Sequence, residues 1–308
     1  MLSHLERYTL MKRSIITLSV ILLSIGISYA QNKKIKILIS VDMEGVAGVV
    51  TAEQLGPSGF EYERFRRFMT DEALAAINGA FEAGATEIVV ADAHGNGQNL
   101  LIEKFPDDVR IIRSWPRRFG MVAGIDASFD GVILIGYHAS THNMKGVRAH
   151  TFSSARLTDV RVNEHSVSEG MWAAMVTGHF DVPVIMISGD DIATKEITDF
   201  LGDVEVAVVK EAYGFHSANT LTPAAAVRLI KDASSKAVGR LKDFKPYKIA
   251  GPVKLEVSFK NYQPSAVLEY LSIVERISSH SIRFTGKDMV EVADFFVFLM
   301  EYNSSIQP

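Results

Sequence analysis

The sequence predicts an α/β protein: a three-layer architecture with a mostly parallel sheet, followed by a smaller C-terminal α+β lobe. Short apolar runs rich in valine and isoleucine recur along the chain, and such runs are typical of strands buried on both faces. Stretches with apolar residues at helical spacing lie between several of them, and this alternation favours a parallel sheet. The 308 residues are 47% hydrophobic and 22% charged, enough for one large domain or two smaller ones.

The strands predicted for the sheet are apolar, mostly β-branched runs: residues 35–41, 86–91, 109–113, 131–136, 182–188 and 204–210. The helices predicted among them have an apolar face at helical spacing: residues 65–81, 168–179 and 223–241. Residues 152–157 and 160–165 flank Thr158 and Asp159, and this pattern predicts a polar hairpin.

The chain after Pro252 has a different order of elements. It predicts a strand, a helix, a strand and a helix, at 253–259, 265–276, 281–284 and 289–302. Residues 242–251 form the joint before this βαβα unit. We therefore expect a catalytic α/β domain at 31–245 and a small α+β lobe at 246–308.

The N-terminal segment has the pattern of a secretory signal peptide. Residues 11–13 supply positive charge, residues 15–27 are mostly apolar, and residues 28–30 place small side chains before a cleavage site. The apolar stretch is too short to cross a bilayer comfortably, which favours a cleaved signal over an uncleaved membrane anchor. Residues 1–10 are then an upstream extension. We expect an exported protein, periplasmic or extracellular, with no stable membrane insertion after cleavage.

Cysteine is absent from the chain, and the net charge is −4 with no basic block. The absence of cysteine excludes disulfides, a lipoprotein anchor and thiolate metal sites, so any metal ligands have to be histidines or carboxylates. The charge disfavours nucleic acid as a partner.

Asp42 and Glu44 follow the buried strand predicted at 35–41, where the apolar run stops at glycines. A carboxylate in such a place costs several kcal/mol unless it is paired or bound to a metal. On extended chain, residues two apart project to the same side, so both carboxylates can hold one cation or a pair of cations. The alternative is structural, with one acid capping the next helix and the other forming a salt bridge.

Similar residues follow two other predicted strands. Asp92 and His94 come after residues 86–91, and His138 comes after residues 131–136. Ligands of open parallel sheets bind outside the carboxyl ends of the strands, so three strands deliver metal-binding side chains to one rim. Imidazole together with carboxylate suits zinc or another divalent first-row ion.

Four polar residues near this rim allow roles other than metal binding. Asp92 can orient the imidazole of His94 rather than bind metal, and His142 lies in a polar loop where we expect it to be solvated. His150 is interpreted as an unligated histidine that acts as general acid or base. Glu169 either faces the rim or simply benefits from the dipole at the start of a helix.

Several motifs resemble the DppA-type D-aminopeptidases, a family of zinc-dependent exopeptidases. They are SVDMEGVAG, DAHG, GYHA, the HT of HTFSS, SEG before a helix, and GHFDVPVIMISGDD. The similarity runs in order from about Lys36 to Pro223 and is weaker after about Pro246. The polar loop at 140–148 and an exported form depart from the family pattern, and His216 has no assigned role.

The resemblance implies two zinc ions held by three carboxylates and two histidines. Carried onto this sequence, the ligands are those of the matching motifs, with Asp42 bridging both ions: Asp42, Glu44, His94, His138 and Glu169. It also implies a catalytic histidine at His150, peptides with an N-terminal D-residue as substrates, and a ring-like homo-oligomer. Mn or Co also suits these ligands.

The chemistry expected of such a site is amide hydrolysis by a metal-bound hydroxide. Two metal ions about 3.5–4 Å apart can share a water and lower its pKa from about 15.7 towards about 7. Because all three acids serve as ligands and no HExxH motif is present, His150 is the expected proton shuttle. The alternatives are a di-metal phosphoesterase, for which Arg113, Lys145 and Arg148 offer phosphate contacts, and a non-catalytic periplasmic peptide-binding protein.

Overall fold

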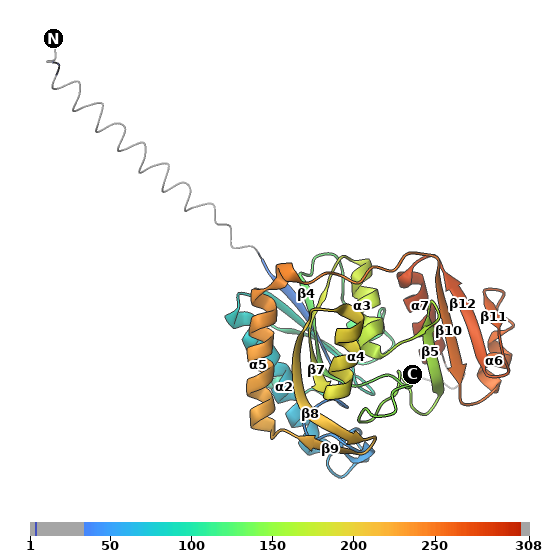
Figure 1. Ribbon diagram of the computed structural model, residues 1–308, viewed down its shortest axis with the longest axis horizontal. Coiled ribbons are helices and arrows are strands. Elements are labelled where there is room, and N and C mark those ends of the chain that lie inside the picture. Colours follow the sequence, from blue (N-terminus) through green and yellow to red (C-terminus); the bar gives the residue numbers. More distant parts are fainter. Residues whose placement is uncertain (1–3, 5–33, 303–308) are drawn as a thin grey trace. The chain divides into compact units, whose positions relative to one another are not determined.

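A seven-stranded sheet positions the candidate site, with the strand order β3-β2-β1-β4-β7-β8-β9 (Figure 1). Its strands are β1 (Lys36–Val41), β2 (Glu87–Asp92), β3 (Arg110–Ile112), β4 (Gly131–Tyr137), β7 (Val184–Asp190), β8 (Glu205–Gly214) and β9 (Ser217–Thr220). All neighbours pair in parallel except β8 and β9, which form an antiparallel hairpin. The computed structural model describes His4 and residues 34–302, and it confirms the predicted α/β class with a mostly parallel sheet.

The strand order reverses between β1 and β4. From β1 the chain adds β2 and then β3 on one side, and it returns to place β4 and then β7 and β8 on the other. In doubly wound sheets such a reversal leaves a crevice at the carboxyl ends of the two central strands, and ligands bind there. The ends of β1 and β4 are therefore the place where the fold itself predicts a site.

Helices cover both faces of this sheet. The helices α2 (Tyr62–Glu82) and α5 (Pro223–Gly239) pack on each other and on one face, where they bury Ile37, Ile39 and Val41 of β1. The helices α3 (Glu169–His179) and α4 (Asp191–Leu201) pack on the other face, where Leu38 points. Both faces of β1 are thus buried, as expected of a strand between two helical layers.

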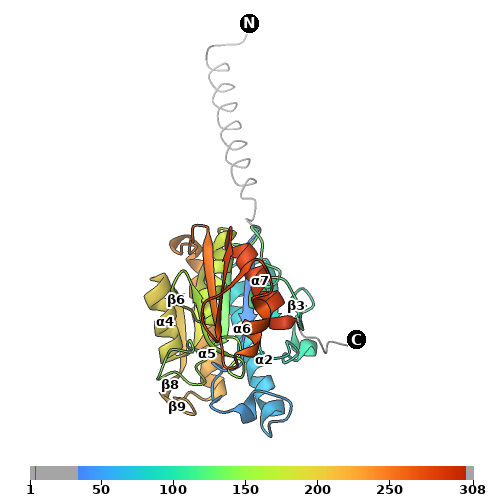
Figure 2. The same cartoon turned by 90° about the vertical axis from the view of Figure 1, so that its right-hand side faces the viewer.

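A second, antiparallel sheet has the order β11-β12-β10-β5-β6. Its strands are β5 (Leu157–Val162), β6 (His165–Ser166), β10 (Val253–Phe259), β11 (Val274–Arg276) and β12 (Ser281–Gly286). The helix α7 (Met289–Glu301) packs against β10, β12 and α3, and it lies with this sheet toward the viewer in Figure 2. Two of the five strands come from the middle of the chain, and residues 35–302 fall in one compact unit. The division at residue 245 stays a prediction.

Two local predictions were wrong. The hairpin turn is at Asn163 and Glu164, whose positive φ values of 46° and 71° suit a two-residue loop, whereas Thr158 and Asp159 lie inside β5. The helix predicted at 265–276 is only α6 (Gln263–Leu268), because the chain then pairs with β12 as β11.

The strand β9 and the helix α4 were not predicted. The strand β9 is a short, exposed polar edge strand without apolar alternation, so its sequence gives no strand pattern. The helix α4 does have a sequence signal, because aspartate is a preferred N-cap residue and Asp190 precedes the helix. In the structure the carboxylate of Asp190 accepts a hydrogen bond from the Ala193 N–H.

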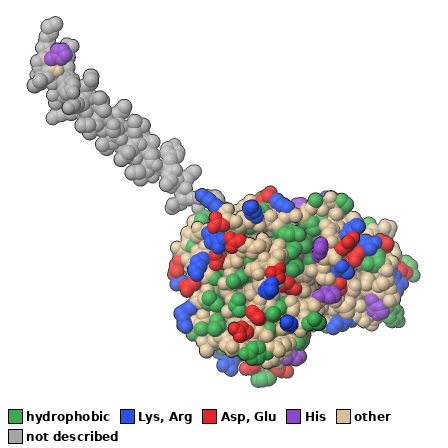
Figure 3. Space-filling model, viewed as in Figure 1, with side chains coloured by type: hydrophobic (Ala, Val, Ile, Leu, Met, Phe, Trp, Pro, Cys, Tyr) green, Lys and Arg blue, Asp and Glu red, His purple; other side chains and the backbone are tan. Residues whose placement is uncertain are grey.

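The predicted signal peptide and the upstream extension lie outside the described residues, apart from His4. Among the helices that the structure describes, none is long and apolar enough to span a membrane. On the face shown in Figure 3, basic and acidic side chains are interspersed over the folded region.

Candidate metal centre

The predicted metal ligands lie at the reversal point of the main sheet. Asp42 and Glu44 follow β1, His94 follows β2, and His138 follows β4. Glu169 is the first residue of α3, which Ser168 caps by accepting a hydrogen bond from the Met171 N–H. All five side chains are buried, with exposed fractions of 7% or less.

Two glycines allow the loop after β1 to pass close to the end of β4. A Cβ atom on Gly45 would overlap the backbone of Gly136 and Tyr137, and a Cβ atom on Gly136 would overlap the carbonyl of Asp42. The Gly45 N–H donates a hydrogen bond to Gly136 O at 2.7 Å, and Gly136 has a φ of +71°. This close approach brings the side chains of Asp42 and His138 into one pocket.

Asp42 is at the centre of the cluster. Its Oδ1 lies 3.1 Å from His94 Nδ1, and its Oδ2 lies 3.4 Å from His138 Nε2. Glu44 Oε2 is 2.9 Å from the same His94 nitrogen, and Glu169 Oε1 is 3.4 Å from His138 Nε2. The structure therefore brings all five predicted ligands together around one cavity of about 240 Å³, which we call the metal cavity.

His94, His138 and the neighbouring His150 share one arrangement. In each, one ring nitrogen contacts a backbone carbonyl oxygen and the other ring nitrogen is directed at a carboxylate. His94 Nε2 contacts Leu55 O at 2.7 Å, His138 Nδ1 contacts Ala139 O at 3.1 Å, and His150 Nδ1 contacts Arg148 O at 2.8 Å. A carbonyl can only accept, so these contacts favour the tautomer whose proton is on the nitrogen that faces the carbonyl. The nitrogen that faces the carboxylate then keeps a lone pair, as in metal-binding histidines.

Three buried atoms of the cluster lack a hydrogen-bond partner of acceptable geometry, namely Asp42 Oδ2, Glu44 Oε2 and His138 Nε2. Such atoms are costly in a protein interior unless something else satisfies them. Potential ligand atoms of Asp42, Glu44 and His138 lie within 4.8 Å of one another, and so do those of His138, His150 and Glu169. Nitrogen and oxygen donors in two adjoining groups fit divalent ions such as zinc.

The protein alone leaves the charges of this cluster unbalanced. Burial raises the pKa of Asp42 to about 8, and repulsion by Glu44 adds to this effect. Burial alone would lower the pKa of His138, but the carboxylates of Glu169 and Asp42 outweigh it and raise that pKa to about 10. Against the effect of burial, the imidazoles of His94 and His138 lower the pKa of Glu44, and His138 lowers that of Glu169, so among the three carboxylates only Asp42 is favoured in its protonated form. Buried negative charge of this density fits a cation-binding site.

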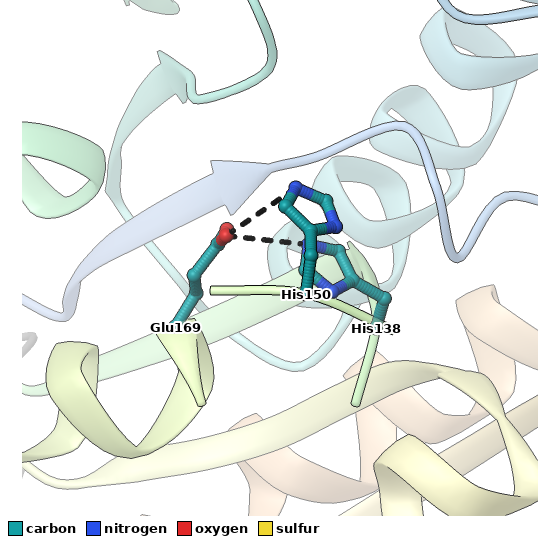
Figure 4. Close-up of side chains that lie close together, drawn as sticks. All are labelled: His138, His150 and Glu169. Atoms are coloured by element: carbon teal, nitrogen blue, oxygen red, sulfur yellow. Dashed lines mark ion pairs between the residues drawn. The ribbon is translucent and has the colours of Figure 1, made fainter. Parts of the chain in front are cut away.

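His150 lies against this cluster. Its ring stacks on that of His138, with centroids 4.1 Å apart and planes 7° apart, and its Nε2 lies 3.8 Å from Glu169 Oε1. Figure 4 shows both imidazoles directed at Glu169. Burial lowers the pKa of His150, and the neighbouring His138 adds to this. His150 also lines the cavity, where it can reach a substrate.

Asp92 has a different role from the one predicted. Its carboxylate accepts hydrogen bonds from Asn99 N, Leu100 N and Asn99 Nδ2, and Asn99 Nδ2 also donates to His94 O. Asp92 therefore fixes the loop that contains His94, whereas the imidazole itself is held by Leu55 O.

The other polar residues singled out in the sequence do not line the metal cavity. His142 is exposed and pairs with Asp159 at 2.8 Å, and His216 contacts Arg148 Nη1 at 3.1 Å. Among the described residues that line the metal cavity there is no lysine or arginine, so Arg113, Lys145 and Arg148 offer no phosphate contact there.

Sequence reasoning missed two buried charged residues beneath the loop after β1. Lys210 Nζ donates to Glu44 O, Val46 O and Val49 O at 2.5, 3.0 and 2.7 Å. Glu72 Oε1 accepts from Ala47 N at 2.9 Å. The sequence did point to Lys210, because this residue ends the strand predicted at 204–210, much as the predicted ligands follow the ends of their own predicted strands. It did not point to Glu72, because helix α2 gives no reason to single out this acid.

The fold and the cluster together define a metal-binding α/β protein whose ligands are of the kind that zinc takes in hydrolases. More specifically, the chain belongs to the Peptidase M55 family, described as D-aminopeptidase, whose model matches residues 35–298. This confirms the resemblance seen in the motifs.

Two relatives show how far the similarity extends. A D-aminopeptidase of Bacillus subtilis (strain 168) is 32% identical over 267 residues, which are 86% of this chain and 97% of that protein. A solved structure, the Zn-dependent D-aminopeptidase DppA from Bacillus subtilis, a self-compartmentalizing protease, matches with a TM-score of 0.83 and 31% identity. That match covers 89% of this chain and 100% of the other. The family model, at residues 35–298, spans every strand of both sheets.

Proposed function

We propose that this protein is a zinc-dependent D-aminopeptidase that removes an N-terminal D-residue from short peptides. The observation on which this rests is the buried cluster at the carboxyl ends of β1 and β4, with unpartnered atoms on Asp42, Glu44 and His138. Membership of the Peptidase M55 family and the zinc dependence of the similar Bacillus subtilis enzyme support the same function.

Five side chains would hold two zinc ions, with Mn or Co as alternatives: Asp42, Glu44, His94, His138 and Glu169. The two carboxylate oxygens of Asp42 face different imidazoles, which supports a bridging position. When bound, the ions would polarise the scissile carbonyl and lower the pKa of the attacking water.

His150 is the residue that we assign to proton transfer. Its Nδ1 is held by Arg148 O, so its Nε2 remains available at the cavity. None of the three carboxylates in the cluster is left over as a general base, because each faces an imidazole within 3.4 Å. We propose that His150 Nε2 takes a proton from the attacking water and passes it to the leaving amine.

Two further proposals concern the setting of the enzyme. The similar DppA structure is described as a self-compartmentalizing protease, and from this we propose a ring-like homo-oligomer for this chain. The signal-like segment at 11–30 supports export to a periplasm, where peptides with D-residues from the cell wall are natural substrates.

The decisive experiment compares D-Ala-D-Ala and L-Ala-L-Ala as substrates of the purified protein. We expect hydrolysis of the D-peptide, its loss after chelation and its return with zinc. A D-peptide with a blocked N-terminus should not be cut, because an exopeptidase needs the free amine. Preference for L-Ala-L-Ala, or activity only on p-nitrophenyl phosphate, would refute the proposal.

A further inference from the structure

A second cavity adjoins the metal cavity. It has a volume of about 230 Å³, and it shares with the metal cavity the residues Ala93, Gly95, Phe152, Ser153 and Glu169. Glu169 faces His138 on one side and lines this second cavity on the other. A molecule held at the metal cluster can therefore extend a side chain directly into this neighbouring space, which we call the apolar cavity.

Aromatic side chains make up much of the wall of the apolar cavity. Phe152 packs on Trp172 and Phe296 with ring centroids 5.4 and 4.5 Å apart, and Trp172 and Phe296 are 4.7 Å apart. Trp115 and Phe119 complete this aromatic lining. Packing of each ring on the others fixes the shape of the wall, so the cavity is present before any ligand enters.

The far wall of the apolar cavity is helix α7. Ala293, Phe296, Val297 and Met300 of this helix line the cavity, as does the acid Glu301 at the end of the helix. Arg156 fixes the end of the helix, because its guanidinium donates to Met300 O at 2.7 Å and to Leu299 O at 3.2 Å. These are carbonyls of the last turn, which have no partner within a helix. Arg156 thereby joins α7 to the segment that follows His150.

We propose that the apolar cavity binds the side chain of the N-terminal residue of the substrate, and that it selects large apolar or aromatic residues. This inference rests on the proposed aminopeptidase function. A methyl group takes about the space of one water molecule, roughly 30 Å³, so an alanine side chain would fill only a small part of the cavity. A benzyl or isobutyl group would contact the aromatic wall.

The side chain of the leaving residue is the less suitable occupant. Peptides longer than two residues continue beyond the leaving residue and need a way out, whereas nothing precedes the N-terminal residue. The wall of the apolar cavity is mostly apolar and aromatic, although Arg156 on it is exposed, whereas the metal cavity has the small exposed residues Ser154 and Ala155 on its wall. The polar backbone of the remaining peptide chain suits the less apolar wall at Ser154 and Ala155.

Three dipeptides distinguish the possibilities in the zinc-loaded wild-type protein. We expect kcat/KM for D-Phe-D-Ala to exceed that for D-Ala-D-Ala by roughly tenfold or more, since each added methylene in an apolar pocket discriminates about 10–200-fold. The kcat/KM for D-Ala-D-Phe should exceed that for D-Ala-D-Ala by a smaller factor than this. A higher kcat/KM for D-Ala-D-Phe than for D-Phe-D-Ala would overturn the assignment to the N-terminal residue.

A pair of variants on α7 then locates the effect. Val297→Trp narrows the apolar cavity, and we expect it to lower kcat/KM for D-Phe-D-Ala by roughly tenfold or more while it leaves D-Ala-D-Ala within about threefold. Val290→Trp is the matched control, since Val290 lies on the same helix, is also half-buried and does not line the cavity. This control should leave both substrates nearly unchanged.

The outcomes separate this inference from the proposed function. Equal losses on both substrates in Val297→Trp, with D-Ala-D-Ala still cut by the wild type, would overturn the side-chain cavity and leave the aminopeptidase proposal standing. Failure of the wild type to cut any of the three dipeptides would instead refute the aminopeptidase proposal, and this inference with it.

Discussion

The imidazole rings of His138 and His150 lie face to face, with centroids 4.1 Å apart and planes 7° apart. His138 is directed at Asp42 and Glu169, whereas the closest carboxylate atom to His150 Nε2 is Glu169 Oε1 at 3.8 Å. The stack holds the His150 ring in place without requiring it to bind a metal. Two adjacent histidines can therefore have different roles, His138 as ligand and His150 as proton carrier.

The first prediction is that His150→Gln retains zinc and loses turnover. General acid–base catalysis typically contributes about 10²–10⁴-fold, and we expect kcat to fall by that order. Metal analysis and steady-state kinetics on the same preparation measure both effects. His142→Gln is the control, because His142 is exposed and pairs with Asp159, and it should change neither value. Loss of zinc from His150→Gln would make His150 a ligand instead.

The second prediction concerns the zinc affinity of Glu44→Gln. This change keeps the shape of the side chain but removes a buried negative charge beside His94. Since loss of a residue that merely supports a ligand costs about 10–100-fold in metal affinity, we expect a direct ligand to cost at least about 100-fold. Competition with a chelator of known affinity provides the measurement.

The control for this prediction is Glu53→Gln, an exposed glutamate on the short helix Ala52–Gln54. It should bind zinc as the wild type does. An unchanged affinity in Glu44→Gln would remove Glu44 from the ligand set.

Most of the predicted metal ligands can be found from the sequence because one physical rule places them. Asp42, Glu44, His94 and His138 all follow buried parallel strands, and the carboxyl ends of such strands meet at one edge of the sheet. Glu169 does not follow from this rule. It starts a helix, where an acid is favoured in any protein, so only the family motif singled it out.

The remaining features of the site depend on contacts that no local pattern encodes. Leu55 O fixes the His94 ring from a loop 39 residues away, and any residue could supply that carbonyl. The apolar cavity combines loops of the main sheet with α7, and none of the family motifs found in the sequence lies in α7. The true position of the hairpin turn depended on Asn163 and Glu164 adopting positive φ values, and composition does not separate this pair from Thr158 and Asp159, because each pair contains one Asn or Asp.

The third prediction is that Lys210→Met destabilises the fold and weakens zinc binding together. Lys210 donates three hydrogen bonds to the loop that contains Glu44, and methionine leaves those buried carbonyls without donors. A buried acceptor left without its donor costs about 1–3 kcal/mol in the free energy of unfolding. Urea unfolding of the zinc-loaded protein measures the loss, and chelator competition measures the affinity.

Lys195→Met is the matched control for Lys210. The ammonium of Lys195 is exposed and pairs with Asp199 one turn along α4. Such surface pairs contribute about 0–1 kcal/mol, so this variant should unfold close to the wild type. If both lysine variants behaved alike, Lys210 would not organise the loop.

The fourth prediction concerns the pH dependence contributed by Glu72. Burial raises the pKa of this carboxyl from 4.5 to about 7, although the Ala47 N–H and Lys210 oppose the shift. Between these two pH values the folded state binds more protons than the unfolded state. The contribution of Glu72 to the free energy of unfolding therefore falls as pH rises from about 4.5 through 7, by up to about 3 kcal/mol.

Glu72→Gln removes this titration while its amide oxygen can still accept from Ala47 N–H. The other carboxylate oxygen, Oε2, has no hydrogen-bond partner, so the new amide nitrogen displaces no existing contact. We expect the variant to gain about 2–3 kcal/mol relative to the wild type at pH 8 compared with pH 5. Taking the difference between the two proteins at each pH cancels the titration of the metal cluster, which they share.

The measurement is urea unfolding of both proteins at pH 5 and pH 8, with Glu82→Gln as the control. Glu82 lies on the same helix, is exposed and pairs with Lys231, so its variant should differ from the wild type by less than about 1 kcal/mol. A difference between Glu72→Gln and the wild type that did not change with pH would mean that Glu72 stays ionised in the fold. Its charge would then be balanced by Lys210, and the two residues would form a buried ion pair beneath the metal loop.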